Sequence, residues 1–206
     1  MNILILNTSE LTGGAAIAAN RLAKALGKSG IEVSMLVRDR KTGDERVTAL
    51  NDSFWASRWN FIRFVWERLI IFICNHFRRK PLFQVSIANT GTDLSDHPLV
   101  KAADVIHLHW INQGFLSLAD IRKLALIGKP IVWTMHDMWP CTAICHYSFG
   151  CERFKKECGE CPFLSSSDKK DLSYHVFNKK RFLADSKIQL VAVSTWLRKQ
   201  AQDSAL

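Results

Sequence analysis

Short apolar runs alternate along this chain with longer stretches in which apolar positions recur every three or four residues. Uninterrupted apolar runs predict buried strands, and the longer spacing predicts helices that pack along one face. The repeated order of strand and helix predicts an α/β fold, a doubly wound parallel sheet with helices on both faces. We expect strands at 2–7, 31–37, 82–88, 105–108, 131–135 and 189–193, and helices at 15–29, 54–79, 116–127, 171–184 and 195–203.

Two neighbouring strands of the expected sheet end in histidine. His109, with Trp110 after it, follows one strand, and His136, with Asp137 after it, follows the next. The C-terminal ends of parallel strands meet at one edge of the sheet, where open α/β sheets bind their ligands. We therefore expect a binding site at this edge. His107 is expected to be buried against a helix, and His109 to reach the sheet edge on the opposite face.

A polar turn that ends in Gly13 and Gly14 joins the first expected strand to the first helix. Glycine has no Cβ, so a ligand can approach the backbone, and the free N–H groups of a helix N-terminus attract phosphate. A tight turn without a ligand is the alternative. The Gly-x-Gly-x-x-Gly fingerprint is absent, so a nicotinamide cofactor is only a minor alternative, and Asp39 is expected to be solvated.

The composition is that of a globular domain: 206 residues, 48% hydrophobic and 23% charged, which we assign to a single domain, 1–206. A net charge of +9 favours anionic partners, but no nucleic-acid-binding motif accompanies it, so we expect no nucleic acid partner. The first residues lack the pattern of a secretory signal, and we expect the protein in the cytoplasm.

The segment 54–80 combines aromatic and basic residues. Its apolar positions follow a helical spacing, but only nine uncharged residues separate Arg68 from Arg78, too few to span a bilayer of about 30 Å. One hypothesis is an interfacial helix at the inner face of the cell membrane, and the other is a core-packed helix with a basic face. The basic residues for the membrane hypothesis are Arg58, Arg63, Arg68, Arg78, Arg79 and Lys80.

Five of the six cysteines lie between Cys141 and Cys161. The last four have the spacing C-x5-C-x6-C-x2-C, in a segment with few aliphatic side chains. Four thiolates around a structural zinc ion would order such a segment, whereas two disulfides or free thiols are the alternatives. The zinc ligands that we predict are Cys145, Cys151, Cys158 and Cys161, with His146 able to replace one thiolate.

Four stretches together resemble a known family. They are Asn7-Thr8 with the later Gly13-Gly14-Ala-Ala, and the stretches 103–112, 128–140 and 191–197. They are similar to the N-terminal domain of retaining GT-B glycosyltransferases, and more narrowly to bacterial group 1 enzymes of surface-polysaccharide biosynthesis. That subgroup carries a similar cysteine segment. The resemblance implies a Rossmann-like domain with a cysteine-rich insertion.

The resemblance also implies a function. Such enzymes, of hexosyltransferase type, move a sugar from a nucleotide-sugar to a glycan or lipid-linked acceptor and keep its anomeric configuration. Their N-terminal half binds the acceptor, and their C-terminal half binds the donor. That donor-binding domain is missing from 1–206, so we expect this fragment alone to be inactive. The family's site then maps to His136 as the catalytic residue and to Gly13, Gly14, His109, Trp110, Asp137 and Ser194 as substrate-binding residues.

A function of another class stays open at this point. A non-catalytic, zinc-stabilised α/β domain could use the same sheet edge to bind an anionic ligand. Hydrolase and kinase functions have no support, since the sequence contains no nucleophile elbow and no phosphate-binding P-loop.

Overall fold

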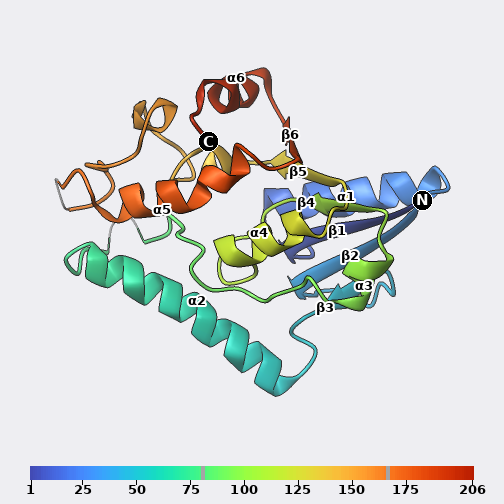
Figure 1. The fold of residues 1–206 in the computed structure, drawn as a ribbon. Helices are drawn as coiled ribbons and strands as arrows, with labels where there is room; N and C mark the ends of the chain where they lie inside the picture. The colour runs from blue at the N-terminus through green and yellow to red at the C-terminus, as the bar shows by residue number, and fades with distance from the viewer. Residues whose placement is uncertain (80–81, 166–167) are drawn as a thin grey trace.

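The computed structural model describes residues 1–79, 82–165 and 168–206. Its centre is a six-stranded sheet with the order β3-β2-β1-β4-β5-β6, in which every pair of neighbours is parallel (Figure 1). This confirms the predicted α/β fold with a doubly wound parallel sheet. The strands are β1 (Asn2–Ser9), β2 (Glu32–Asp39), β3 (Val47–Ala49), β4 (Val105–Leu108), β5 (Ile131–Met135) and β6 (Ile188–Ala192).

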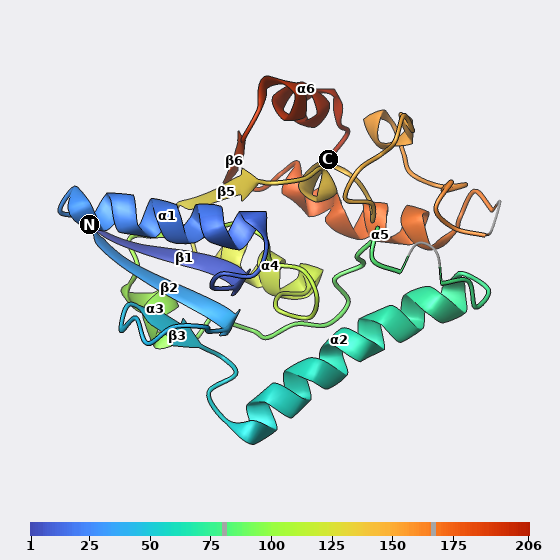
Figure 2. The ribbon, with the colours of Figure 1, turned by 180° about the vertical axis from the view of Figure 1, so that it is seen from behind.

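Helices cover both faces of the sheet, as predicted. Figures 1 and 2, which view the molecule from opposite sides, show α1 on one face and α4 on the other. The α-helices are α1 (Gly14–Lys28), α2 (Phe54–Cys74), α3 (Pro98–Ala102), α4 (Leu118–Leu126), α5 (Leu172–Lys180) and α6 (Thr195–Asp203). Three short 3-10 helices are η1 (Trp139–Cys141), η2 (Arg153–Lys155) and η3 (Arg181–Leu183).

The apolar run of β1 supplies two cores, because successive side chains of a strand point to opposite faces. Leu4 and Leu6 belong to the larger core, which includes residues of α4 and α5. Ile3 and Ile5 belong to the smaller core, with Ala19 of α1. Burial on both faces explains why this strand is a continuous apolar run without alternation.

The segment 82–88 is not a strand, so this part of the prediction is wrong. Its only sheet-like pairing among the described residues is an isolated bridge between Val85 and Cys145. The backbone N–H groups of Ile87 and Ala88 are instead bound by the side chain of Glu67 on α2. The short edge strand β3 was not predicted.

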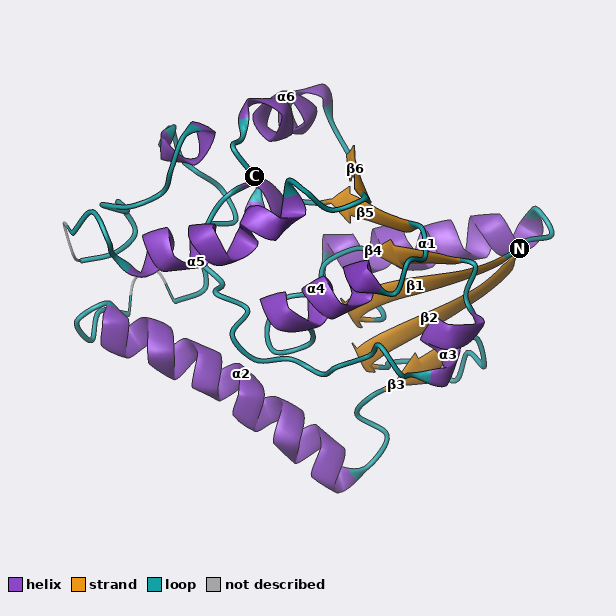
Figure 3. Ribbon diagram, in the orientation of Figure 1, coloured by secondary structure: helices purple, strands orange, loops and turns teal. Residues whose placement is uncertain are grey.

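The chain between η1 and α5 is mostly loop and contains four of the six cysteines (Figure 3). None of the helices within 1–79, 82–165 and 168–206 combines the length and the hydropathy that crossing a membrane requires.

Candidate functional site

A pocket of about 670 Å³ lies at the edge of the sheet where β1, β2, β4 and β5 end. In this strand order, the chain passes from β1 to β2 in one direction along the sheet and from β4 to β5 in the other, so a topological switch point lies between β1 and β4. Ligands of doubly wound sheets bind at such a point, outside the carboxyl ends of the strands. The lining comprises Asn7, Thr8, Ser9, Thr12, Gly13, Gly14, Ala15, Ala16, Arg38, Asp39, Lys41, Trp110, Gln113, His136, Asp137 and Tyr147.

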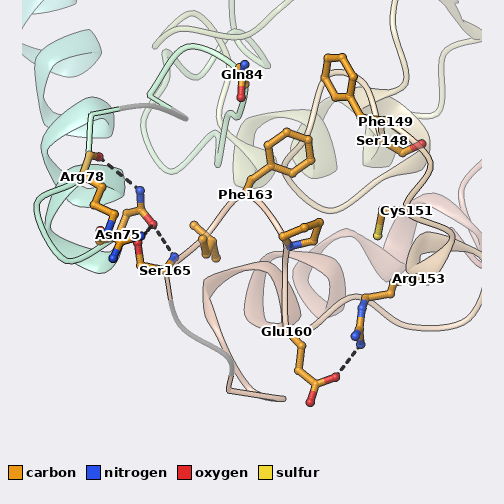
Figure 4. A pocket seen from close by; sticks show the side chains of 12 residues that line it. Asn75, Arg78, Gln84, Ser148, Phe149, Cys151, Arg153, Glu160, Phe163 and Ser165 are labelled. Carbon is orange, nitrogen blue, oxygen red and sulfur yellow. Dashed lines mark hydrogen bonds and ion pairs between the residues drawn. The ribbon is translucent and has the colours of Figure 1, made fainter.

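A larger pocket, of about 770 Å³, lies between the end of α2 and the cysteine segment (Figure 4). Its lining comes mostly from loops, and some of its polar groups pair with each other: Arg153 binds Glu160 at 2.7 Å, and the Asn75 side chain accepts the Ser165 N–H at 2.7 Å. None of the strand-end residues lies in it. We therefore place the candidate site in the smaller pocket, at the sheet edge.

The N-terminus of α1 opens into this pocket. Gly13 precedes the helix with φ 92°, a conformation that favours glycine, and no side chain caps the first turn. The first turn also contains no acidic residue. A Cβ at Gly14 would meet no atom within 4 Å. Uncapped N–H groups beside open space form a surface that suits an anion.

The end of β1 fixes the position of Trp110. The Asn7 side-chain oxygen accepts the Trp110 N–H at 2.8 Å. The Thr8 N–H and hydroxyl both donate to the Trp110 carbonyl, at 2.8 and 3.0 Å. Asn7 and Thr8 are buried, so these bonds hold the segment after β4 rigidly against β1.

Two basic side chains line the same pocket: Arg38 at the end of β2 and Lys41 in the loop after it. The predicted solvation of Asp39 is wrong, because Asp39 forms an ion pair with Arg38 at 2.6 Å and accepts a hydrogen bond from Asn51. The buried Glu10 carboxylate accepts the Lys41 N–H at 2.6 Å and so holds the loop in place. The pocket thus presents Lys41 and the Asp39-paired guanidinium of Arg38 beside the helix N-terminus.

Three histidines form a cluster behind and beside the pocket. His109 Nδ1 lies 2.9 Å from His136 Nε2, and His107 Nε2 lies 2.8 Å from the Thr134 hydroxyl. The rings of His107 and His109 are 4.5 Å apart. The expectation of opposite faces is therefore wrong, because residues two apart along a strand share a face.

His109 supports the site from behind and does not line it. It is 4% exposed, whereas His136 is part of the pocket wall. The buried Nε2 of His109 has no hydrogen-bond partner among the described residues. An unpaired buried N–H costs more than an unpaired lone pair, so we assign the His109 proton to Nδ1. His136 Nε2 then accepts, and the neutral His136 ring carries its proton on Nδ1.

Burial keeps these imidazoles neutral. Desolvation, with repulsion from His136, lowers the pKa of His107 to about 4. Desolvation, with repulsion from His107 and His136, lowers the pKa of His109 to about 3. Burial also lowers the pKa of His136, although the neighbouring Asp137 charge acts in the opposite direction. At neutral pH, His136 is therefore a neutral hydrogen-bonding group.

Asp137 organises the other side of the pocket. Its carboxylate accepts hydrogen bonds from His146 Nδ1 at 2.7 Å, the Trp139 N–H at 2.8 Å and the Trp110 indole N–H at 3.1 Å. Burial alone would raise the pKa of Asp137, but the bonds from His146, Trp139 and Trp110 outweigh it and hold the pKa below its usual value. Asp137 is therefore an anion that orients the Trp110 ring.

Ser86, His146 and Asp137 are connected like a hydrolytic triad, with Ser86 Oγ 3.0 Å from His146 Nε2. Ser86 is 1% exposed, and Arg68 also binds its hydroxyl, so no substrate can reach it. The arrangement is structural, and it occupies both ring nitrogens of His146. The predicted replacement of a zinc thiolate by His146 is therefore wrong.

The turn after Asp137 is held by a buried lysine. Lys180 of α5 is fully buried and donates to the carbonyls of Trp139 at 2.6 Å and Thr142 at 2.9 Å. Burial lowers its pKa to about 7. Its role is to position η1, the element that follows the pocket wall.

Of the predicted site residues, Gly13, Gly14, Trp110, His136 and Asp137 come together in one pocket. Ser194 does not join them. It caps α6, where its hydroxyl accepts the Leu197 N–H at 3.1 Å, and it lines a separate pocket beyond β6. Arg38, Lys41 and Tyr147 are lining residues that the sequence did not indicate.

The four cysteines of the predicted zinc site surround one narrow cavity of about 20 Å³. They form no disulfide, and burial raises the pKa of Cys158 and Cys161 to about 12 because it disfavours the charged thiolate. Within the part of the chain that the structure describes, no group of three or more His, Cys, Asp or Glu side chains is arranged to hold a metal ion. The zinc assignment stays a prediction, supported by the convergence of the thiols on one cavity.

Metal analysis tests that prediction. We expect about one zinc per chain in protein purified without chelator, because four thiolates form a complete tetrahedral shell. The double variant Cys158→Ser/Cys161→Ser is expected to lose the metal. Cys74→Ser is the matched control, since Cys74 lies on α2 away from the cavity and is exposed. Less than a tenth of an equivalent in the unaltered protein would exclude zinc.

The fold is that of a doubly wound α/β domain, and its candidate ligand site lies at the topological switch point. The profile of Glycosyltransferase Family 4 matches residues 12–204, which is nearly the whole chain. The chain belongs to this family. Membership of this family favours the glycosyltransferase expectation over the non-catalytic, anion-binding domain.

A curated relative narrows the comparison. A stretch of 70 residues is 33% identical to WcaC of Escherichia coli (strain K12), which is named as a colanic acid biosynthesis glycosyl transferase. The match covers 34% of this chain and 17% of that protein, so the chain aligns with only a small part of its relative. No solved structure matches the chain.

Proposed function

We propose that this chain is the acceptor-binding half of a retaining GT-B glycosyltransferase of surface-polysaccharide biosynthesis. The enzyme would transfer a sugar, of the hexosyl type, from a nucleotide-sugar to a glycan or lipid-linked acceptor. The observation that carries the proposal is that an uncapped helix N-terminus, two basic side chains and a neutral histidine line one pocket. Family membership and the name of the relative support it.

The residues suit the chemistry of this transfer. The acceptor hydroxyl oxygen forms a bond to the anomeric carbon while the bond to the leaving diphosphate oxygen breaks on the same face. The diphosphate takes the bonding electron pair, and the hydroxyl proton passes to its oxygen. N–H groups of α1 and the cationic groups of Arg38 and Lys41 would stabilise the negative charge that develops there.

His136 would bind the transferred sugar. Its Nδ1–H, fixed by the bond between its Nε2 and His109, would donate to a sugar hydroxyl. We propose that the opposite wall of the site belongs to a C-terminal donor-binding domain outside residues 1–206. Residues 1–206 alone would then transfer no sugar.

The glycine turn offers a test of the proposal. Gly14→Val is expected to lower kcat/KM of the complete enzyme by about tenfold to a hundredfold, because the side chain would fill the space in front of the α1 N–H groups. The measurement is transfer from a nucleotide-sugar to a prenyl-diphosphate-linked sugar.

The control substitution lies at the other end of the same helix. A Cβ at Gly27 would lie 3.5 Å from its nearest neighbour, the Arg46 guanidinium, which is an ordinary contact, so Gly27→Ala is expected to keep full activity. Equal activities of the Gly14→Val and Gly27→Ala enzymes would contradict a ligand at the glycine turn.

A further inference from the structure

Helix α2 exposes an apolar stripe and buries mainly polar residues. Its positions 55, 59, 62, 66, 69 and 73 form one continuous stripe at the spacing of three and four that a helix in water normally buries. All six side chains of this stripe are exposed, from 41% for Leu69 to 78% for Trp55. The exposed stripe consists of Trp55, Trp59, Ile62, Trp66, Leu69 and Ile73.

The face that α2 turns toward the protein is largely polar. The buried residues of α2 are Asn60, Glu67, Arg68 and Ile71, three of which are polar or charged. A core-packed helix would show the opposite arrangement. Ile71 belongs to the larger core and Ile70 packs against it, but the six residues of the stripe do not, so the hypothesis of a core-packed helix is wrong for the stripe.

Buried bonds fix this orientation. The Glu67 carboxylate accepts the backbone N–H groups of Ile87 at 2.8 Å and Ala88 at 2.9 Å, and Glu67 forms an ion pair with Arg68 at 2.9 Å. Arg68 also donates to the Val85 carbonyl at 2.9 Å. Buried charges without partners are costly, so a helix rotated to hide its aromatic residues would lose these bonds.

The charges around the stripe have one sign. Glu67 is the only acidic residue between 54 and 80, and it is buried. Arg58, whose guanidinium lies 4.9 Å from the centre of the Phe54 ring, Arg78 and Arg79 are exposed. Lys80, included in the membrane hypothesis, lies outside the described residues, and Arg63 points inward to the Thr92 hydroxyl.

We propose that α2 is an interfacial helix that lies flat on an anionic lipid bilayer. Trp55, Trp59 and Trp66 would occupy the boundary between headgroups and acyl chains, and the exposed arginines would bind lipid phosphates. Both views of the ribbon place α2 along the outer side of the molecule, where its 21 residues, about 30 Å long, can lie against a flat surface (Figures 1 and 2).

Charge favours lipid over a second copy of the chain. A second copy would present the same exposed arginines and no exposed acidic side chain from 54–79, so its α2 would not complement the charge of this surface. An anionic bilayer matches both the apolar stripe and the arginines. The proposal is independent of the glycosyl transfer reaction.

Vesicle flotation of the 206-residue chain tests the proposal. The probes are vesicles of phosphatidylglycerol and phosphatidylcholine in equal parts, and vesicles of phosphatidylcholine alone. We expect the protein to float with the anionic vesicles and to bind them less at high salt. Trp55→Ser/Trp59→Ser and Arg58→Glu/Arg78→Glu are each expected to reduce binding by at least about tenfold.

Trp196→Ser is the matched control, because Trp196 is 51% exposed on α6, and it should bind like the unaltered chain. The altered side chains are exposed, so the variants should fold, which circular dichroism checks. Absence of flotation by the unaltered chain, or equal binding by all variants, would overturn the proposal. So would dimers in sedimentation velocity that the Trp55→Ser/Trp59→Ser variant abolishes, without binding to vesicles.

Discussion

Replacing His136 by alanine is expected to lower the rate of sugar transfer by the complete enzyme by about a hundredfold or more. His136 is the strand-end histidine that lines the pocket, and its ring orientation is fixed by the 2.9 Å bond to the buried His109. Alanine removes the polar group from the pocket wall. It also leaves His109 Nδ1 without its partner.

Two variants separate this role from a structural one. His136→Gln keeps a side-chain amide that can donate to a sugar hydroxyl, so it should recover part of the activity. His175→Ala changes an exposed histidine of α5 outside the pocket and should leave activity within about twofold. Initial rates with a nucleotide-sugar and a prenyl-diphosphate-linked acceptor are the measurement. Full activity of His136→Ala would exclude this histidine from transfer.

Acidification is expected to destabilise the folded chain strongly between pH 6.5 and pH 4. The folded pKa is about 4 for His107 and about 3 for His109, against an ordinary value of 6.5, and that of His136 is also lowered. In this window the unfolded chain binds more protons than the folded chain. The free energy of unfolding therefore falls as pH falls, by an amount on the order of 5 kcal/mol.

Urea unfolding at a series of pH values measures this loss. The slope of the unfolding free energy against pH gives the number of protons that unfolding takes up. His109→Gln removes one titrating group, so its slope should fall by about one proton, whereas His175→Gln should leave the slope unchanged. A free energy of unfolding that does not change between pH 6.5 and pH 4 would contradict the neutral histidine cluster.

The centre of the sheet was predictable because β1 is buried on both faces, whereas the helices bury one face. A short continuous apolar run such as β1 indicates a strand that is buried on both faces. The N-cap at Ser194 confirms the predicted start of the last helix. Segment 82–88 is also rich in apolar residues, but the N–H groups of Ile87 and Ala88 bind a side chain of α2. The conformation of this segment depends on its contact with Glu67 of α2, which the local sequence pattern does not reveal.

The site was predictable only where its residues directly follow a strand or the glycine turn. Trp110, His136 and Asp137 meet in the pocket because parallel strands end at one edge. Arg38 looks like any other basic residue of a basic chain, and only the fold brings it beside α1. Ser194 also follows a strand, but β6 is at the far edge of the sheet, away from the switch point.

The orientation of α2 shows another limit of sequence patterns. Helical spacing identified its apolar positions correctly, but spacing does not say whether a stripe faces the core or the outside. The decision lies with Glu67 and Arg68, whose buried bonds to segment 82–88 turn the aromatic stripe outward.

The most direct test of the central claim is a nitrogen-15 NMR titration of the 206-residue chain with a short-chain prenyl-diphosphate-linked sugar. The account predicts saturable shifts of the Trp110 indole N–H and, because the acceptor hydroxyl must lie next to the sugar that His136 binds, of the His136 imidazole nitrogens, with no change at His175. Saturable binding that leaves His136 and Trp110 unchanged would place the acceptor elsewhere and contradict the account.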